Sequence, residues 1–453
     1  MKWIAVALVM LSVLTGCESA GESPVADPTP TTRDRPSAPV ALGTTDWPTY
    51  HHDNARTGVA AAVPPPGRLS QAWSAKLDGA VYGQPLVIGD KVIAATENDT
   101  VYALAATDGR VLWSRHLGSP QPRSGLKCGN IDPLGITSTA AYDPATGLVF
   151  VLAELDGGSH LLAGLDLATG AVTLSRPLEP PQGDRLAHQQ RAALTVLDGW
   201  VYVAYGGLYG DCGDYIGSVV AAPTTGLGGT RGYAVPTTRE AGIWAPGGAA
   251  VSGGRLYYAV GNGESTSDYD HSDSVLALTP ELTLADSFSP AEWIDDNARD
   301  LDLGSMGPAV VGGQVLAVGK RKVGYVLDPA RLGGIGGQLS QQNICPAYGG
   351  SSVDGSTVYL PCRDGTRAVD VGAGRATVRW QAPVKADGSP VVGGGAVWTI
   401  DVASGVLHAL DQGTGAVRAQ LPVGQVPHFA SPTLAGQQAY VGTLSGVVAL
   451  RGI

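Results

Sequence analysis

A pattern of short strands and tight turns recurs along most of this chain and constrains the fold more than any other feature. Each copy runs from a small-residue start through two alternating strands, an apolar strand and a Thr-Gly turn, and the clearest copy spans Gln84 to Trp113. Copies start at intervals of about 40 to 60 residues, near Gln84, Ser138, Gln189, Ala245, Met306, Gly349, Ser389 and Ser431. Almost no helical periodicity accompanies them. Repeats of this kind are typical of solenoids and propellers.

The two ends of the repeat region complement each other. The last copy, near Ser431, lacks its fourth strand, whereas Leu69 to Leu77 match an outer strand but have no repeat of their own ahead of them. Pairing these two ends removes an unpaired strand edge and covers an apolar face. The sequence therefore predicts an all-β fold in one domain, residues 46–453: an eight-bladed β-propeller closed by pairing of an N-terminal strand with the last blade.

Composition agrees with a folded, acidic protein. Hydrophobic residues make up 44% of the chain and charged residues only 15%, which favours a large buried core over disorder. The formal net charge is −11, so the surface repels phosphate backbones and a nucleic-acid partner is disfavoured. We expect a monomer.

The N-terminus has the character of an export signal. An apolar run from Ile4 to Leu14 is too short to span a bilayer, and it ends in Leu-Thr-Gly-Cys at Cys17, which resembles a bacterial lipobox. The resemblance implies that residues 1–16 are a signal peptide and that Cys17 is lipidated. Residues 17–45 are rich in Pro, Ser and Thr and predict a disordered tether. We therefore expect an extracytoplasmic protein anchored to the membrane by lipid.

Four further cysteines fit the same compartment. An even number in an exported chain, with no C-x-x-C spacing, favours two disulfides over a metal site or a nucleophile. Three pairings are possible. We favour Cys345 with Cys362 because they are close in sequence, which leaves Cys128 with Cys212.

Val101 to Trp113 nearly match V-Y-A-L-D-x-x-T-G-x-x-x-W, and on these residues the chain resembles the PQQ-like repeat family. In that family the tryptophan fills the gap between neighbouring blades. The resemblance implies this packing role for Trp73, Trp113 and Trp380, with Leu174 and Ala419 as degenerate replacements. Because the family holds both enzymes and non-enzymes, the fold does not determine the function.

One stretch is similar in order to the quinoprotein alcohol dehydrogenases. It contains Trp244, then Asn262 in a Gly-Asn turn, then Asp300 and Asp302, and finally Lys320, Arg321 and Lys322. The resemblance implies that Trp244 forms the floor under a quinone, Asn262 ligates calcium, Asp302 or Asp300 is the catalytic base, and Lys320 or Lys322 contacts the cofactor. A hard cation takes oxygen ligands and polarises a carbonyl, while a carboxylate can accept the alcohol proton.

The chain also departs from that pattern. It has no adjacent pair of cysteines, which in those dehydrogenases form a disulfide over the cofactor. Their calcium-ligating glutamate has no match, because the corresponding stretch offers only Asp211 and Asp214 as metal ligands. A Gly-Asn turn is in addition an ordinary turn sequence.

Three smaller features have simpler interpretations. The carboxylates of residues 268–273 lack the Gly and distal Glu of a calcium loop, so we expect a solvated loop. His188 is expected to form hydrogen bonds at a blade entrance rather than to face the axis. The paired histidines His51 and His52 suggest metal binding, but packing of Trp47 and Tyr50 onto the ring is the favoured interpretation.

The sequence as a whole favours a binding or scaffold module without chemistry of its own, which contacts a protein or an envelope component through its loops. The propeller lipoprotein of the outer-membrane β-barrel assembly machinery is similar in architecture. The alternative is a PQQ-dependent dehydrogenase that oxidises an alcohol or a sugar with PQQ and calcium as cofactors. A glycan-binding propeller is a third hypothesis.

Overall fold

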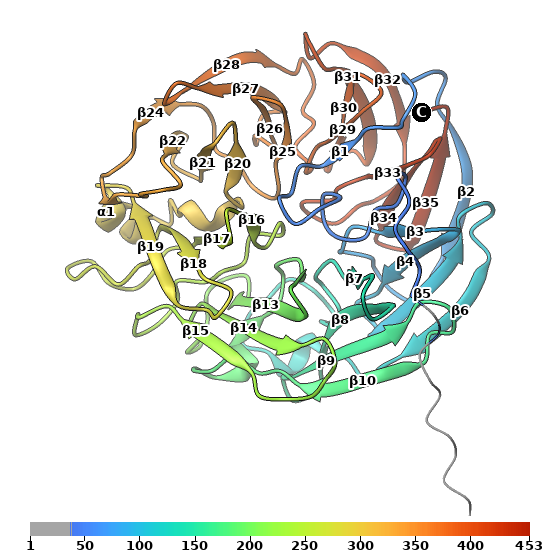
Figure 1. The fold of residues 1–453 in the computed structure, drawn as a ribbon, viewed down its shortest axis with the longest axis horizontal. Coiled ribbons are helices and arrows are strands. Elements are labelled where there is room, and N and C mark those ends of the chain that lie inside the picture. The colour runs from blue at the N-terminus through green and yellow to red at the C-terminus, as the bar shows by residue number, and fades with distance from the viewer. Residues whose placement is uncertain (1–36, 38) are drawn as a thin grey trace, which may run out of the picture. The chain divides into compact units, whose positions relative to one another are not determined.

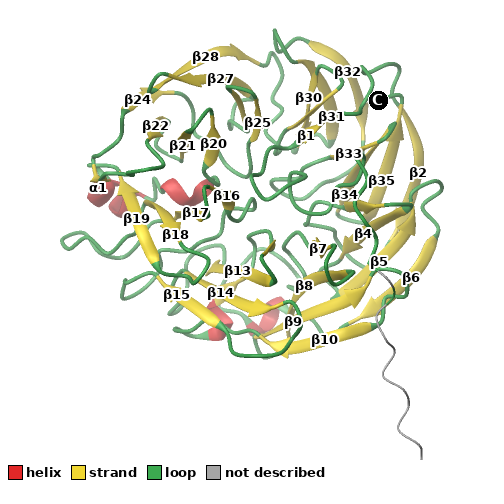
Figure 2. Ribbon diagram, in the orientation of Figure 1, coloured by secondary structure: helices red, strands yellow, loops and turns green. Residues whose placement is uncertain are grey.

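The computed structural model describes residues 37 and 39–453, and strands dominate it (Figure 2). Alternating apolar residues with Gly-rich turns every few positions explain this, since they suit short, half-buried strands. The helices of the described part are short: α1 (Trp293–Arg299) and the 3₁₀ helices η1 (Arg123–Gly125), η2 (Arg185–Ala187) and η3 (Leu303–Ser305). None of its helices has the length and apolar character needed to cross a membrane.

The strands form eight sheets arranged as blades around an axis, as predicted (Figure 1). The first blade contains β3 (Leu86–Ile88), β4 (Lys91–Ala95), β5 (Thr100–Ala105) and β6 (Val111–His116). The second contains β7 (Ala141–Asp143), β8 (Leu148–Leu155), β9 (Ser159–Asp166) and β10 (Val172–Pro177). The third contains β12 (Thr195–Leu197), β13 (Trp200–Gly207), β14 (Ser218–Pro223) and β15 (Arg231–Ala234), and β11 (His188–Gln189) also pairs with β13. The fourth contains β16 (Ala250–Ser252), β17 (Arg255–Val260), β18 (Ser274–Leu278) and β19 (Leu284–Ser289), extended by β23 (Gly334–Ile335).

The remaining blades follow in chain order. The fifth contains β20 (Ala309–Val311), β21 (Gln314–Val318), β22 (Val323–Leu327) and β24 (Ser340–Asn343). The sixth contains β25 (Ser352–Asp354), β26 (Thr357–Leu360), β27 (Arg367–Gly372) and β28 (Arg375–Gln381). The seventh contains β29 (Val391–Gly393), β30 (Ala396–Asp401), β31 (Val406–Asp411) and β32 (Val417–Pro422), extended by β1 (Val59–Ala60). The eighth contains β33 (Thr433–Ala435), β34 (Gln438–Thr443) and β35 (Gly446–Arg451), completed by β2 (Ser70–Lys76).

Ring closure follows the predicted route. Strand β2 pairs antiparallel with β35, with Trp73 opposite Ala449, so the N-terminal strand becomes the outer strand of the last blade. The apolar core at this closure joins residues from both ends of the chain, among them Trp73 and Leu450. The prediction of circular closure is therefore confirmed.

The predicted tryptophans connect consecutive blades. Each indole N–H donates to a main-chain carbonyl of the next blade: Trp73 to Ala106 (2.9 Å), Trp113 to Leu167 (3.0 Å) and Trp380 to Gln412 (3.1 Å). Each indole also lies over the glycine of the Thr-Gly or Asp-Gly turn that follows, and a Cβ at Gly109, Gly170 or Gly415 would lie only 2.5, 2.5 or 2.6 Å from an indole carbon. Leu174 makes a looser contact of the same kind, 3.1 Å from a Cβ built on Gly226. The packing role expected for the three tryptophans and for Leu174 is confirmed.

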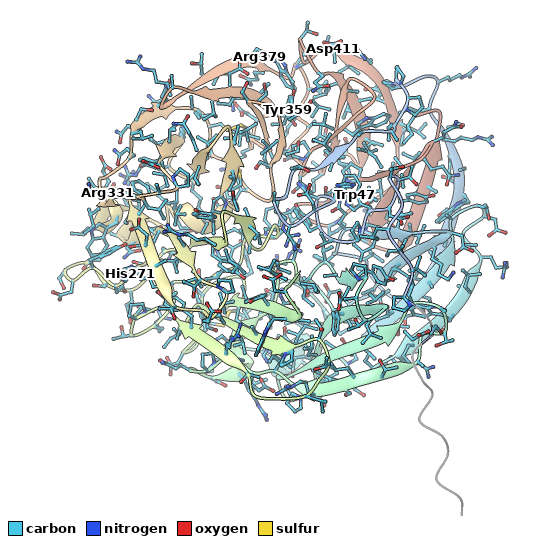
Figure 3. All side chains as sticks on the ribbon, in the orientation of Figure 1. Trp47, His271, Arg331, Tyr359, Arg379 and Asp411 are labelled. Carbon is cyan, nitrogen blue, oxygen red and sulfur yellow. A yellow bond between two sulfur atoms is a disulfide. The ribbon has the colours of Figure 1, made fainter. Side chains whose placement is uncertain are left out.

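Residues 46–60, here called the axial segment, cross the inside of the ring. Their main chain bonds with inner strands or adjoining residues of several blades: Trp47 with Val87, Pro48 with Tyr142, Asn54 with Val251, Thr57 with Val353 and Gly58 with Val392. Arg56 is buried and donates to the carbonyls of Leu194 and Ala249. Trp47 lies inside the ring, whereas Arg379 and Asp411 lie at its rim (Figure 3). The expected packing of Trp47 and Tyr50 onto the ring is confirmed, because both are buried.

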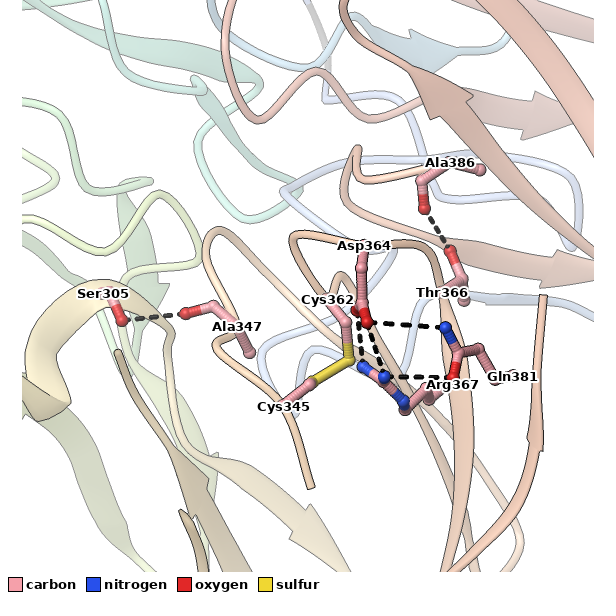
Figure 4. The surroundings of a disulfide bond; sticks show 9 residues. All are labelled: Ser305, Cys345, Ala347, Cys362, Asp364, Thr366, Arg367, Gln381 and Ala386. Atoms are coloured by element: carbon pink, nitrogen blue, oxygen red, sulfur yellow. Dashed lines mark hydrogen bonds and ion pairs between the residues drawn. A yellow bond between two sulfur atoms is a disulfide. The ribbon is translucent and has the colours of Figure 1, made fainter. Parts of the chain in front are cut away.

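Both disulfides form in the favoured pairing. Cys345 and Cys362 join the fifth blade to the sixth, and Figure 4 shows them beside the ion pair of Arg367 with Asp364. Cys128 and Cys212 join the loop between the first two blades to the third blade. The bonds therefore link blades in addition to the strand pairing within them.

The predicted signal peptide and Cys17 lie outside the described residues. The predicted tether lies largely outside them as well. Near its end, the main-chain N–H of Ser37 donates to Asp166, and that of Val40 donates to the hydroxyl of Tyr142. The boundary at residue 46 stays a prediction.

Candidate functional site

Trp244 lies at the axis of the ring, on the loop that leads into the fourth blade. Its indole packs against Phe429, which leads into the eighth blade, with ring centroids 6.0 Å apart and planes tilted by 44°. Because the fourth and eighth blades stand opposite each other in an eight-bladed ring, a contact between them lies at the axis. Gly206, at the end of a third-blade strand, lets Trp244 approach the third blade closely, since a Cβ at Gly206 would lie 2.8 Å from the Cβ of Trp244.

The Gly-Asn turn is next to Trp244. A Cβ on Gly261 would lie 3.2 Å from the indole Nε1, and Asn262 accepts a main-chain hydrogen bond from Ala241. The turn also touches the following segment, because a Cβ on Gly304 would lie 2.3 Å from the main-chain nitrogen of Gly261. Asn262 is half-buried. The predicted floor and the predicted calcium ligand are thus neighbours.

Asp302 is buried and forms an ion pair with Lys320, whose Nζ lies 2.8 Å from Oδ2. Its other oxygen, Oδ1, is buried without a hydrogen-bond partner. Burial raises the pKa of Asp302 to about 6, against the opposing effect of the Lys320 ammonium, while nearby Asp300 and Asp211 add to the rise. Lys320 keeps its charge, because Asp302 and Asp300 raise its pKa against the effect of burial. A carboxyl of this kind is ionised at neutral pH and can accept a proton.

The other predicted site residues are less central. The side chain of Asp300 is 63% exposed, although it also pairs with Lys320, and Lys322 is exposed at a turn. Asp211 accepts a hydrogen bond from Tyr215 at 2.6 Å, and Asp214 is exposed. The structure therefore places the Asn262 turn beside Trp244 and Lys320 beside Asp302, and the close approach of Gly304 to Gly261 joins the two pairs. Asp211 contributes to the raised pKa of Asp302.

Asp273 completes this group, and the sequence did not single it out individually. It is fully buried, its Oδ1 accepts a hydrogen bond from the main chain of Leu303 at 3.0 Å, and its Oδ2 has no partner. Burial raises the pKa of Asp273, and the charge of Asp302 raises it further. We call Trp244, Asn262, Asp273, Asp302 and Lys320 the axial site. Of the loop expected to be solvated, Asp268 is exposed as predicted, whereas Asp270 and Asp273 are buried, so the expectation is wrong for these two carboxylates.

A second group lies beside Trp244. The guanidinium of Arg191 stands 5.6 Å from the ring centres of both Phe429 and Tyr82, and it donates to the carbonyl of His428 across the ring. His188, in contrast, bonds with the main chain of Asp184 and Ile216, as expected for a blade entrance. Phe429 was not identified from sequence, because its contacts with Trp244 and Arg191 join distant parts of the chain.

Both ring nitrogens of His51 in the axial segment are engaged within the ring. His51 is fully buried between the carbonyl of Ser351 and the hydroxyl of Ser431, and burial lowers its pKa to about 3. It therefore remains neutral and links the sixth and eighth blades.

Comparison with known proteins gives a family match and a curated relative. Residues 64–259 match a PQQ-type repeat family described as "Outer membrane protein assembly factor BamB". This match covers less than half of the chain. Polyvinylalcohol dehydrogenase from Sphingopyxis sp. (strain 113P3) is 26% identical over 314 residues, which cover 59% of this chain and 45% of that protein. The chain thus spans less than half the length of this curated relative.

Solved structures share the fold of this propeller. The quinohemoprotein alcohol dehydrogenase ADHIIG from Pseudomonas putida HK5 has a TM-score of 0.73 at 16% identity, covering 92% of this chain and 83% of that one. BamB from Moraxella catarrhalis has a TM-score of 0.60 at 17% identity, covering 84% and 99%. Enzymes and an assembly factor are therefore both among its structural neighbours.

The axial site provides groups suited to a quinone and a hard cation. The donor set is the relevant observation: buried, unpartnered oxygens on Asp302 and Asp273, a half-buried amide at Asn262, and an indole beside them. Carboxylate and amide oxygens are what calcium prefers. The surroundings of this group differ from the quinoprotein alcohol dehydrogenase pattern. The chain has no adjacent pair of cysteines, and the ring of Phe429 packs on Trp244.

Proposed function

We propose that the protein binds a pyrroloquinoline-type quinone at the axial site and oxidises an alcohol or a sugar. The observation that supports the proposal is the close approach of the Asn262 turn to Trp244 and to the segment after Asp302, where Asp302 pairs with Lys320 and keeps Oδ1 buried and unpartnered. The sequence alone favours a binding module, and the spatial convergence of these four residues changes that preference. The dehydrogenase relative and the dehydrogenase neighbours support the same proposal.

Each residue has a distinct task in this proposal. Trp244 offers an aromatic face for a planar ring, and Asn262 and Asp273 offer oxygens to a cation. Lys320 holds Asp302 in place at 2.8 Å and favours its ionised form. Asp302 then accepts the hydroxyl proton of the substrate. A bound quinone would supply the hydride acceptor.

Cofactor titration tests the proposal directly. PQQ and calcium are added to the full-length protein, absorbance in the quinone band reports binding, and a dye-linked assay reports alcohol oxidation. We expect saturable binding and a rate that rises with pH through about 6, where Asp302 loses its proton. Asp302→Asn should retain the quinone signal and lose the rate, while Lys322→Met, at an exposed turn, should change neither. Absence of binding at high micromolar PQQ would refute the proposal.

A second candidate is a binding module for a protein or an envelope component. The match of residues 64–259 to the BamB-type family favours it, as does the absence of the calcium-ligating glutamate from the sequence. Affinity capture from membrane extract tests this function. One stoichiometric partner without PQQ binding would support the module, whereas measurable turnover without such a partner would contradict it.

Export and anchoring are part of both proposals. We propose that Cys17 is lipidated after removal of residues 1–16, which holds the propeller outside the cytoplasm. Mass spectrometry of the mature N-terminus tests this, and Cys17→Ser should release the protein from the membrane fraction. An unmodified Cys17 in membrane-associated protein would refute it.

A further inference from the structure

Arg191 is a buried cation at the axis of the ring, on the loop that leads into the third blade. The residue is only 8% exposed, and its guanidinium stands 5.6 Å from the ring centres of Tyr82 and Phe429. These two rings belong to the loops that lead into the first and the eighth blade. Because Phe429 also packs on Trp244, a single aromatic ring joins Arg191 to the axial site.

The guanidinium makes few hydrogen bonds for a buried arginine. Within the described part of the chain it donates only to the main-chain carbonyls of Thr137, at 3.3 Å, and His428, at 3.0 Å. Arg56, which is buried to the same degree in the axial segment, donates to main-chain and hydroxyl oxygens through Nε and both terminal nitrogens. An arginine has N–H donors on all three nitrogens, but the Nε–H of Arg191 bonds to no described residue. Arg191 therefore keeps donors for a ligand, whereas Arg56 does not.

The charge of Arg191 is not fully compensated. The carboxylate that acts on it is Glu97, at the turn between β4 and β5, and no ion pair joins the two side chains in the described residues. Glu97 instead directs Oε2 at the Gly135 N–H and the Thr137 hydroxyl, which lie 2.8 and 3.1 Å away. Burial also raises the pKa of Glu97 to about 7, so near neutral pH it carries only part of a negative charge. A buried charge is costly unless it is paired, and an anion bound at Arg191 would complete the pairing.

The residues around the guanidinium are aromatic and partly open to solvent. Tyr82, Trp244 and Phe429 are half-buried, and His428 is exposed. Phe429 has φ +66°, a left-handed backbone that is rare for a bulky residue and that is found preferentially at functional sites. A ligand that reaches Arg191 would therefore pass between aromatic faces, which suit the carbon chain of an organic molecule better than an inorganic ion.

We propose that Arg191 binds the carboxylate of the substrate, so that the alcohol oxidised at the axial site is a hydroxy acid or a sugar acid. The planar fork of a guanidinium matches a carboxylate and binds it through two parallel hydrogen bonds. Phe429 and Tyr82 then pack against the carbon chain of the ligand. The identity of the substrate rests on the proposed function, whereas anion binding at Arg191 does not.

Isothermal titration calorimetry on the full-length protein, without quinone, tests anion binding. The probes are gluconate and sorbitol, which differ only in that gluconate has a carboxylate where sorbitol has a hydroxymethyl group. At constant ionic strength we expect saturable binding of gluconate and at least about tenfold weaker binding of sorbitol, because a hydrogen-bonded charge is lost. This comparison uses the wild type alone, so it does not depend on the folding of a variant. Absence of gluconate binding at millimolar concentration, or equal binding of the two probes, would overturn the proposal.

Variants locate the binding. Arg191→Gln should weaken gluconate binding at least about tenfold, and Arg191→Lys, which keeps the charge but not the planar fork, should have an intermediate affinity. Arg110→Gln, at an exposed turn of the first blade, should bind gluconate as the wild type does. Full gluconate affinity in folded Arg191→Gln would overturn the assignment to Arg191.

Titration in the presence of PQQ and calcium identifies the source of the carboxylate, because the quinone itself carries carboxylates. Unchanged gluconate affinity would assign Arg191 to the substrate, whereas competition between the two would assign it to the quinone and overturn the proposal. In the dye-linked assay, Arg191→Gln should raise KM for gluconate with little change in kcat. Gluconate binding without any turnover would refute the proposed function and leave the anion subsite intact. Turnover with equal KM for gluconate and sorbitol would have the opposite meaning.

Discussion

The contact of each outer-strand tryptophan with a glycine of the next blade predicts how firmly neighbouring blades are joined. At Gly109 the main chain has φ +73°, and a Cβ would lie 2.5 Å from the indole of Trp73. Gly313 offers a matched control, because its φ is +74° and nothing lies within 4 Å of the position of its Cβ. Alanine at either position suffers the same backbone strain, but only Gly109→Ala also forces the indole away.

The two costs are of different size. Left-handed backbone costs a non-glycine residue about 1–2 kcal/mol, so Gly313→Ala should lower the free energy of unfolding by that amount. Overpacking costs a further 1–3 kcal/mol or so, so Gly109→Ala should lower it by about 2–5 kcal/mol. Equilibrium unfolding in guanidinium chloride measures both. Equal losses in the two variants would refute the argument that indole and glycine interlock the blades.

A double-mutant cycle sharpens the test. Trp73→Ala alone removes the large side chain at ring closure and should cost about 3–5 kcal/mol. In that background Gly109→Ala meets no indole, so its additional cost should shrink to the strain of about 1–2 kcal/mol. The difference is the coupling between the two residues. Full additivity would show that they act independently.

Three further outcomes are expected. Lys320→Met leaves Asp302 buried without its ion pair and should lower the free energy of unfolding by roughly 3 kcal/mol above pH 7. Lys322→Met should leave that free energy unchanged. Similar stability of the two variants would contradict the pairing of Lys320 with Asp302. The folded protein binds more protons than the unfolded chain between the ordinary pKa of Glu97, 4.5, and its raised pKa of about 7. The free energy of unfolding should therefore fall as pH rises through that window, and Glu97→Gln should flatten the titration. Replacing Cys345 and Cys362 by Ser should lower the free energy of unfolding by about 3 kcal/mol. Reductant should then lower the denaturant midpoint of this variant less than that of the wild type, because one of the two disulfides is already absent.

The sequence predicted the fold well because its determinants are local. A tryptophan such as Trp113 ends one repeat, and it packs against a turn glycine, such as Gly170, of the next repeat along the chain. Neighbours in sequence are thus neighbours in the ring. The repeat count follows from the eight recurring start positions, and the pairing of β2 with β35 follows from the missing strand near the C-terminus.

The candidate site was harder to predict. The order from Trp244 to Lys320 identified segments that lie side by side in the structure, but it did not distinguish buried Asp302 from largely exposed Asp300 and Lys322, because turn positions look alike in sequence. Phe429 reaches Trp244 from the opposite blade, a contact for which the linear pattern has no signal.

The axial segment imposes an order on biogenesis. It leaves the ribosome before any blade does, yet the hydroxyl that receives His51 belongs to Ser431, and the partner of β2 ends at Arg451. The first part of the domain to be synthesised thus cannot form all of its native contacts until residues 431–451 are synthesised. During synthesis the axial segment therefore lacks some of its native contacts while the blades form, and it reaches its final packing only after the eighth blade has been made.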